Sequence, residues 1–195
     1  GGVLDDDLDA LVFCTGYDYT FPFLHKDIGI TVKDRGVRPL YRHLYFTEDP
    51  TLAFVGLPWK IAPFPLFDCQ TRHVAKAWTG QIPLPNRKDM EAERARDEKM
   101  RFTEMGLPQR YYHQFGELQW EYNKQLITEA NGGKEPEDFN LARKYEIYKD
   151  AGMSRRKDAS SYRLRNYFLH PDGGWRVEEP SSSSSSSESP ATVVS

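Results

Sequence analysis

Hydrophobic residues form short runs in the first third of this chain and helix-like stripes after it. Residues 10–14, Ala-Leu-Val-Phe-Cys, are apolar without alternation, which is typical of a strand buried on both faces in a parallel sheet. Thr15-Gly16 then ends the run, since glycine tolerates a positive φ and lets a ligand or another backbone come close. Any buried strand followed by a turn would show the same pattern.

Further strands are predicted downstream. Residues 28–32 and 37–46 read as two strands joined by a hairpin turn at Asp34-Arg35-Gly36. Residues 19–24 form an irregular, aromatic-rich segment, and residues 52–57 are predicted to be a second buried strand ended by Pro58. Strands followed by a proline-rich loop and then a helix are typical of an α/β cofactor domain.

Four helices are predicted after this region, over residues 66–78, 87–105, 118–130 and 139–150. The first should turn a stripe to the core, made of Phe67, Thr71, Val74 and Trp78. The second carries charge pairs at helical spacing, Glu91–Arg94, Glu93–Arg96 and Asp97–Arg101. Each such pair contributes only about 0.2–0.5 kcal/mol, so we interpret this helix as a solvated face without assigned function.

Composition narrows the possible partners. The formal charge is −3 and no long basic block occurs, which argues against nucleic acid or an anionic membrane surface as the main partner. No apolar run approaches the ~20 residues that span a bilayer. Cys14 and Cys69 lie in apolar settings and are expected to be buried, reduced thiols, which favours a cytoplasmic location. The five histidines show no metal-ligand spacing, so no metal site is predicted.

The two ends of the chain carry little structural signal. The seven serines from Ser181 to Ser187 cannot bury apolar surface and are predicted to be disordered. The first residues, Gly-Gly-Val-Leu-Asp-Asp-Asp, include neither a methionine nor a signal-like segment. We therefore expect this sequence to be part of a longer protein.

Four sequence motifs follow one another between residues 9 and 80. Residues 9–17 read D-x3-F-C-T-G-Y, and Y-x-F-P-F-L, P-x-L-A-F-V-G-L and D-C-Q-T-R-H-V-A-K-A-W-T-G follow. Together they resemble the flavin-containing monooxygenases, in which the first motif usually has alanine where this chain has Cys14. The resemblance is close over residues 9–80 and loose beyond them.

The resemblance implies an α/β fold, the C-terminal part of a flavoprotein with two dinucleotide-binding domains, made of short strands and helices with a helical C-terminal region. Residues 1–17 would end the NADP-binding domain and 18–80 would complete the FAD-binding domain. Residues 81–178 would form the helical region and 179–195 a disordered tail. In the family, NADPH reduces FAD, and a flavin hydroperoxide then transfers oxygen to a small-molecule nitrogen or sulfur nucleophile.

Cofactor-contacting residues are implied at two places. Thr15, Gly16 and Tyr17 would shape the crossover between the domains, or access of the substrate. The start of the helix after Pro65 offers unpaired N–H groups and a partial positive charge of ~0.5, which suit the electron-rich carbonyl edge of a flavin. The residues implied to contact the cofactor there are Phe64, Pro65, Phe67, Asp68 and Gln70. A plainer interpretation makes Asp68 an ordinary acid of the first helical turn and the phenylalanines core residues.

Other interpretations stay open. Cys69 and His73 are four residues apart and could form a thiol–imidazole pair at a helix start that lowers the thiol pKa, but no third group orients them. A Baeyer–Villiger-type relative, a disulfide-reductase relative and a non-catalytic interaction module are alternatives. The chain contains no G-x-G-x-x-G loop, so alone it should hold neither FAD nor NADPH tightly. The substrate and the oligomeric state are left open.

Overall fold

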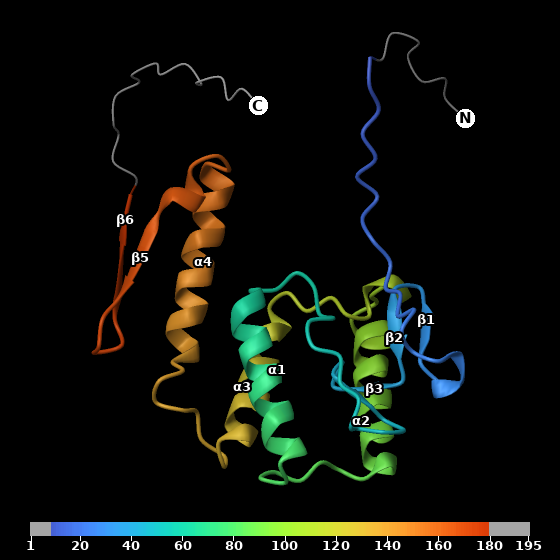
Figure 1. The fold of residues 1–195 in the computed structure, drawn as a ribbon. Helices are drawn as coiled ribbons and strands as arrows, with labels where there is room; N and C mark the ends of the chain where they lie inside the picture. Colours follow the sequence, from blue (N-terminus) through green and yellow to red (C-terminus); the bar gives the residue numbers. More distant parts are fainter. Residues whose placement is uncertain (1–8, 180–195) are drawn as a thin grey trace, which may run out of the picture. The chain divides into compact units, whose positions relative to one another are not determined.

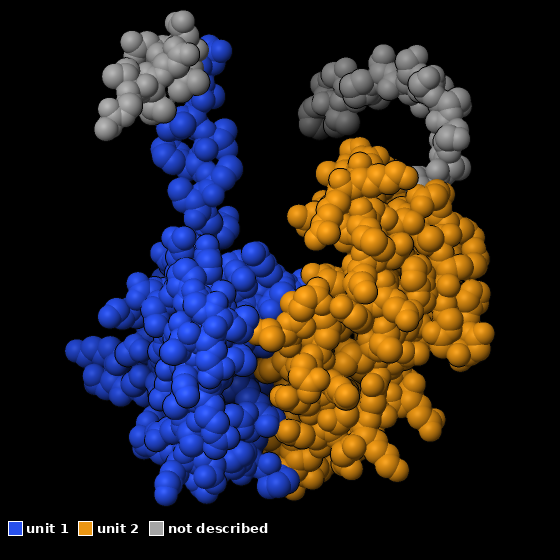
Figure 2. All heavy atoms as spheres, turned by 180° about the vertical axis from the view of Figure 1, so that it is seen from behind, with its two compact units in different colours: residues 1–61, 83–116 blue, residues 62–82, 117–195 orange. Residues whose placement is uncertain are grey.

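A computed structural model describes residues 9–179, which divide into two compact units (Figures 1 and 2). Among these residues, unit 1 holds 9–61 and 83–116, and unit 2 holds 62–82 and 117–179. Each unit is therefore built from two separate stretches of sequence. The predicted disordered serine run lies outside the described residues.

Unit 1 contains two small antiparallel hairpins. β1 (Thr31–Lys33) pairs with β2 (Gly36–Arg38), and Val32 lies opposite Val37. Asp34 and Arg35 form the turn with φ values of 50° and 59°. Two successive positive φ values give the turn a twist that matches the flanking strands. The predicted hairpin is confirmed, with shorter strands.

The predicted strand over residues 37–46 is broken by a second turn. β3 (Leu40–Tyr41) pairs with β4 (Tyr45–Phe46), while Arg42 and His43 both have φ of 54°, which a strand cannot contain. The predicted strand over 52–57 is reduced to one bridge between Ala53 and Tyr45. These segments nevertheless build the core of the unit, from Val37, Leu40, Phe46, Phe54 and Leu57.

The buried strand predicted over residues 10–14 is wrong. Residues 9–20 contain neither helix nor strand, and Leu11, Val12 and Phe13 are 60%, 79% and 78% exposed. Cys14 is exposed as well, against expectation. A buried strand needs neighbours on both sides, and none of the strands in residues 9–179 pairs with this segment. The apolar run therefore lies open to solvent.

The charged helix of unit 1 forms as predicted, but its face is not fully solvated. α2 (Arg87–Lys99) continues into a π-helical turn, η2 (Met100–Glu104), and Gly106 follows with φ of 65°. The predicted pair Asp97–Arg101 is present at 2.9 Å. Arg101 is only 2% exposed, so the solvated interpretation fails there. Short 3₁₀ turns, η1 (Lys26–Ile28) and η3 (Gln109–Tyr111), complete the unit.

Unit 2 is mainly helical (Figure 1). α1 (Pro63–Trp78) packs on α3 (Leu118–Ala130), and the chain continues through α4 (Leu141–Lys157) and η4 (Tyr162–Leu164). An antiparallel hairpin of β5 (Asn166–Leu169) and β6 (Trp175–Glu178) ends the described chain. α3 has the predicted bounds, whereas α4 runs to Lys157, past the helix end predicted at residue 150. Helices with short strands confirm the predicted α/β class.

The core-facing stripe predicted for α1 is largely wrong. The buried residues are Leu66, Cys69, Gln70, His73 and Val74. Thr71 is exposed and Trp78 is 53% exposed. Because α1 buries polar side chains that bond to α3, apolarity alone points to the wrong face.

Among residues 9–179, no helix is both long and apolar enough to cross a membrane.

Candidate functional site

Thr15, Gly16 and Tyr17 lie in the irregular segment at the start of unit 1. All three are exposed, and the Tyr17 side chain is 97% exposed. Gly16 has φ of 78°, a conformation that favours glycine. Arg35 braces this segment, since its Nη2 donates to the Thr15 carbonyl oxygen at 3.3 Å and its Nε donates to Asp18 at 3.1 Å. The backbone is thus tied to the β1–β2 turn while the side chains face solvent.

The second predicted segment, residues 64–70, forms the first two turns of α1 in unit 2. Phe64 is 82% exposed, so it is not a core residue. Phe67 and Asp68 are half-buried, and Asp68 accepts a hydrogen bond from Arg72 at 2.8 Å. Gln70 is fully buried. The two prolines fit the first turn of a helix, which explains why α1 begins before the predicted residue 66.

The prolines also limit what the start of α1 can donate. Pro63 and Pro65 carry no N–H, so Phe64 provides the one backbone donor among the first three residues of the helix. No side chain caps this end. The partial positive charge of the helix remains there. The site therefore combines one amide donor, the helix dipole and an exposed aromatic ring.

Two glutamines fix this helix start to α3. Gln119 is fully buried; its Oε1 accepts from the Ala62 N–H and its Nε2 donates to the Ala62 carbonyl oxygen, both at 2.7 Å. Gln70 Nε2 donates to the Tyr122 hydroxyl at 2.9 Å. Three hydrogen bonds from buried side chains therefore hold the first turns of α1 within unit 2.

Cys69 is a packed thiol rather than a nucleophile. It is fully buried, and burial, together with the nearby Asp68 carboxylate, raises the pKa of the thiol to about 12. The prediction that the helix start lowers this pKa is wrong, because burial disfavours the thiolate more than the helix dipole favours it. His73, also buried, bonds through Nε2 to Glu129 at 3.1 Å.

Unit 1 holds a polar cluster that sequence reasoning missed. His43 and His113, 3% and 0% exposed, approach through their Nδ1 atoms at 2.9 Å. His43 Nε2 lies 3.0 Å from Asp97, and Arg101 Nε donates to both Asp97 oxygens at 3.0 and 2.9 Å. The cluster thus joins the β3–β4 turn to α2 and to the segment after η3.

One backbone amide fixes the proton positions in this cluster. The Val37 N–H donates to His113 Nε2 at 2.9 Å, so that nitrogen carries no proton. A neutral His113 then carries its proton on Nδ1 and donates to His43 Nδ1. His43 in turn carries its proton on Nε2 and donates to Asp97. All the donors therefore run in one direction, toward the carboxylate.

The surroundings keep both imidazoles neutral. Burial, reinforced by the neighbouring His43 ring and by the positive charges of Arg38 and Arg101, lowers the pKa of His113 to about 2. Burial also lowers the pKa of His43, outweighing the attraction of Asp97. For Asp97, burial opposes ionisation, but the hydrogen bond from His43 and the charge of Arg101 still hold the pKa of this carboxyl below its usual range. The cluster is one anion, one cation and two neutral rings.

The cluster offers no site for a reaction or a ligand. Its side chains bond to one another, and no three His, Cys, Asp or Glu side chains among residues 9–179 are placed to hold a metal ion. The histidines are 70 residues apart, and only the Asp97–Arg101 spacing hinted at the arrangement. We interpret the cluster as a structural element that stabilises unit 1.

Comparison with known proteins gives the family. The family described as flavin-binding monooxygenase-like matches residues 1–130. The protein named flavin-containing monooxygenase FMO GS-OX-like 4, from Arabidopsis thaliana, is 38% identical over 157 residues, covering 80% of this chain and 33% of the relative. FMO GS-OX-like 5 of the same plant is 38% identical over 133 residues, covering 68% and 29%.

A solved structure supports the same family assignment. The S-allyl-L-cysteine S-oxygenase from Allium sativum is 38% identical with a TM-score of 0.67, covering 77% of this chain and 33% of that one. The chain spans a third or less of the length of these relatives. With most of its length matched by the family, this chain belongs to the flavin-binding monooxygenase-like proteins.

Proposed function

We propose that this chain is part of a monooxygenase that uses FAD, NADPH and dioxygen to oxygenate the sulfur of a small molecule. One oxygen atom enters the substrate as a sulfoxide, the other leaves as water, and NADPH supplies the two electrons. The observation that carries the proposal is the match to a solved protein named an S-oxygenase, at 38% identity over 77% of this chain. Nitrogen nucleophiles are the competing substrate class.

The first turn of α1 fits one edge of a flavin. The Phe64 N–H and the positive end of the helix suit a carbonyl oxygen that gains electron density, and the exposed Phe64 ring can cover a flat ring system. FAD, when bound, supplies the activation of dioxygen. In this proposal Phe64, Pro65 and Phe67 exclude water from that edge, while Asp68 and Gln70 keep the helix start in place.

Gln119 and Gln70 act as positioning residues in this proposal. Their hydrogen bonds to Ala62 and Tyr122 fix the direction of the first turn, and a donor must be held in place to stabilise developing charge. Thr15, Gly16 and Tyr17 would form the crossover from the NADP-binding domain, ending at residue 17. Residues 18–80 would then complete the FAD-binding domain of a cytoplasmic enzyme.

The test uses the complete gene product that carries this sequence. Purified protein should be yellow, should oxidise NADPH faster when an S-alkylcysteine is added, and should release the sulfoxide, identified by mass spectrometry. Phe64→Ala should lower flavin content or kcat/KM by about tenfold if the ring covers the cofactor. Phe23→Ala is the matched control, because Phe23 is similarly exposed, at 78% against 82% for Phe64, but lies in unit 1.

Each result has a clear meaning. Protein that binds no flavin would overturn the enzyme proposal and leave a non-catalytic interaction module. An N-oxide from a tertiary amine without any sulfoxide would overturn only the substrate class. Equal effects of the Phe64 and Phe23 substitutions would remove Phe64 from the cofactor site.

A further inference from the structure

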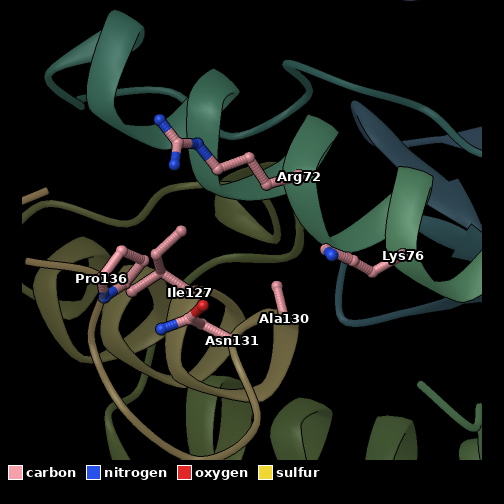
Figure 3. A pocket seen from close by; sticks show the side chains of 6 residues that line it. All are labelled: Arg72, Lys76, Ile127, Ala130, Asn131 and Pro136. Carbon is pink, nitrogen blue, oxygen red and sulfur yellow. The ribbon is translucent and has the colours of Figure 1, made fainter. Parts of the chain in front are cut away.

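A small pocket lies in unit 2 near the C-terminal ends of α1 and α3 (Figure 3). Its volume is about 310 Å³. The lining residues are Arg72 and Lys76 from α1, Ile127, Ala130 and Asn131 from the end of α3, and Pro136 from the segment after it. This size is at the lower end of the range for small-molecule sites, about 300–1,000 Å³.

The lining is divided between apolar and cationic groups. Ile127, Ala130 and Pro136 form an apolar floor, while the two cations of α1 stand one helical turn apart and repel each other. No carboxylate belongs to the lining. An anionic ligand with an apolar part would therefore offset the repulsion between Arg72 and Lys76 and cover the apolar side chains of the pocket.

The two cations are not equally available. Arg72 Nε donates to Asp68 at 2.8 Å and its Nη2 lies 3.8 Å from Asp138, so its charge is partly neutralised. Lys76 Nζ donates to the neutral Gln81 side chain at 2.5 Å, and among the described residues it has no ion pair with a carboxylate. An ammonium group has three N–H donors, so Lys76 retains two for a ligand.

We propose that this pocket binds a small organic carboxylate with a short aliphatic group, with the carboxylate on Lys76 and the aliphatic part over Ile127 and Ala130. One available ammonium matches one carboxylate better than a phosphate dianion, which takes more donors. Lys76 lies near the end of α1 opposite to Phe64. The pocket is therefore separate from the predicted flavin-facing turn and independent of it.

The test is a titration of the full chain with sodium hexanoate, followed by backbone amide chemical shifts in ¹H–¹⁵N spectra. The amides of Lys76, Ala130 and Asn131 should shift in a saturable way. Hexanol and hexylammonium have the same aliphatic chain without the negative charge, and they should bind at least about fivefold more weakly. This comparison needs no substitution, so it does not depend on the folding of a variant.

Substitutions then test whether Lys76 provides the positive charge that binds the carboxylate. Lys76→Gln should weaken hexanoate binding about threefold to tenfold, and Lys76→Arg should retain most of it. Lys124→Gln is the matched control, since Lys124 is an exposed lysine of α3 outside the lining. Equal binding of hexanol and hexanoate, no saturable shift at these amides, or unchanged affinity in Lys76→Gln would each overturn the proposal.

Discussion

His43 and His113 share a hydrogen bond between their Nδ1 atoms, 2.9 Å apart, inside unit 1. This bond needs one ring to donate and the other to accept, and therefore at least one neutral ring. Because the Val37 N–H donates to His113 Nε2, His113 is neutral and donates through Nδ1, so His43 Nδ1 must accept and His43 is neutral as well. Protonation of either ring puts an N–H where an acceptor is required.

Acid should therefore destabilise unit 1. Both histidines have a folded-state pKa below the usual 6.5, so the unfolded chain binds more protons than the folded one once the pH falls below that value. The stability is complete above pH 6.5 and is lost progressively below it, by up to about 1.4 kcal/mol per pH unit for each ring. Below about pH 4, protonation of Asp97 adds to the loss, because its folded-state pKa is also lowered.

Hydrogen exchange can measure this effect in unit 1 itself. The Val37 and Leu44 amides, which are bonded to His113 and to the Tyr41 carbonyl oxygen, should lose protection between pH 7 and pH 5 after correction for intrinsic rates. His25→Gln is the control, since His25 is exposed and should leave the profile unchanged. A protection free energy that is constant over this range would show that the rings do not set the stability of the unit.

Arg101→Met should destabilise unit 1 by about 3 kcal/mol. The substitution keeps much of the side-chain volume but leaves Asp97 without its cation and removes the donor to the Gln114 carbonyl oxygen. Urea unfolding followed by Trp59 fluorescence would measure it, with the other tryptophans replaced. The matched control Arg87→Met removes an exposed arginine at the start of α2, the helix that continues into η2, and should cost less than about 1 kcal/mol. Equal losses would mean that burial of the pair has no special effect.

Local signals predicted the elements better than the site. The Asp34-Arg35-Gly36 turn and the bounds of α3 follow from neighbouring residues, and the structure confirms them. The strand over residues 10–14 depended on neighbouring strands that the described residues do not provide, so its apolar pattern was not enough. Sequence could identify such a run but not its partners.

The histidine cluster shows a second limit. His43 reaches the interior because it occupies a turn with φ of 54°, a conformation that its sequence context did not predict. Asp97 and Arg101 have the spacing of an ordinary surface pair, yet a π-helical turn and the histidines bury Arg101. Contacts between residues far apart in sequence determined this site, and a one-dimensional pattern does not contain them.

The two cysteines should differ sharply in reactivity. Cys14 is exposed, whereas Cys69 is fully buried with its pKa raised to about 12, so almost no thiolate exists at Cys69 near pH 8. Iodoacetamide should label Cys14 first and Cys69 only after denaturant is added. Mass spectrometry of peptides from the same sample compares the sites directly. Labelling of native Cys69 at the rate of Cys14 would contradict the packed-thiol assignment.

Gln119→Ala should destabilise unit 2 by about 1–3 kcal/mol, because it leaves the N–H and the carbonyl of Ala62 without their side-chain partner at the start of α1. Gln125→Ala, at an exposed position on the same helix, removes the same atoms and should cost less than about 0.5 kcal/mol. Hydrogen exchange of the α1 amides would compare the two variants. In the proposed complete enzyme, Gln119→Ala should also lower flavin content, whereas Gln125→Ala should leave it unchanged. Loss of stability without any change in flavin content would limit Gln119 to holding α1 on α3.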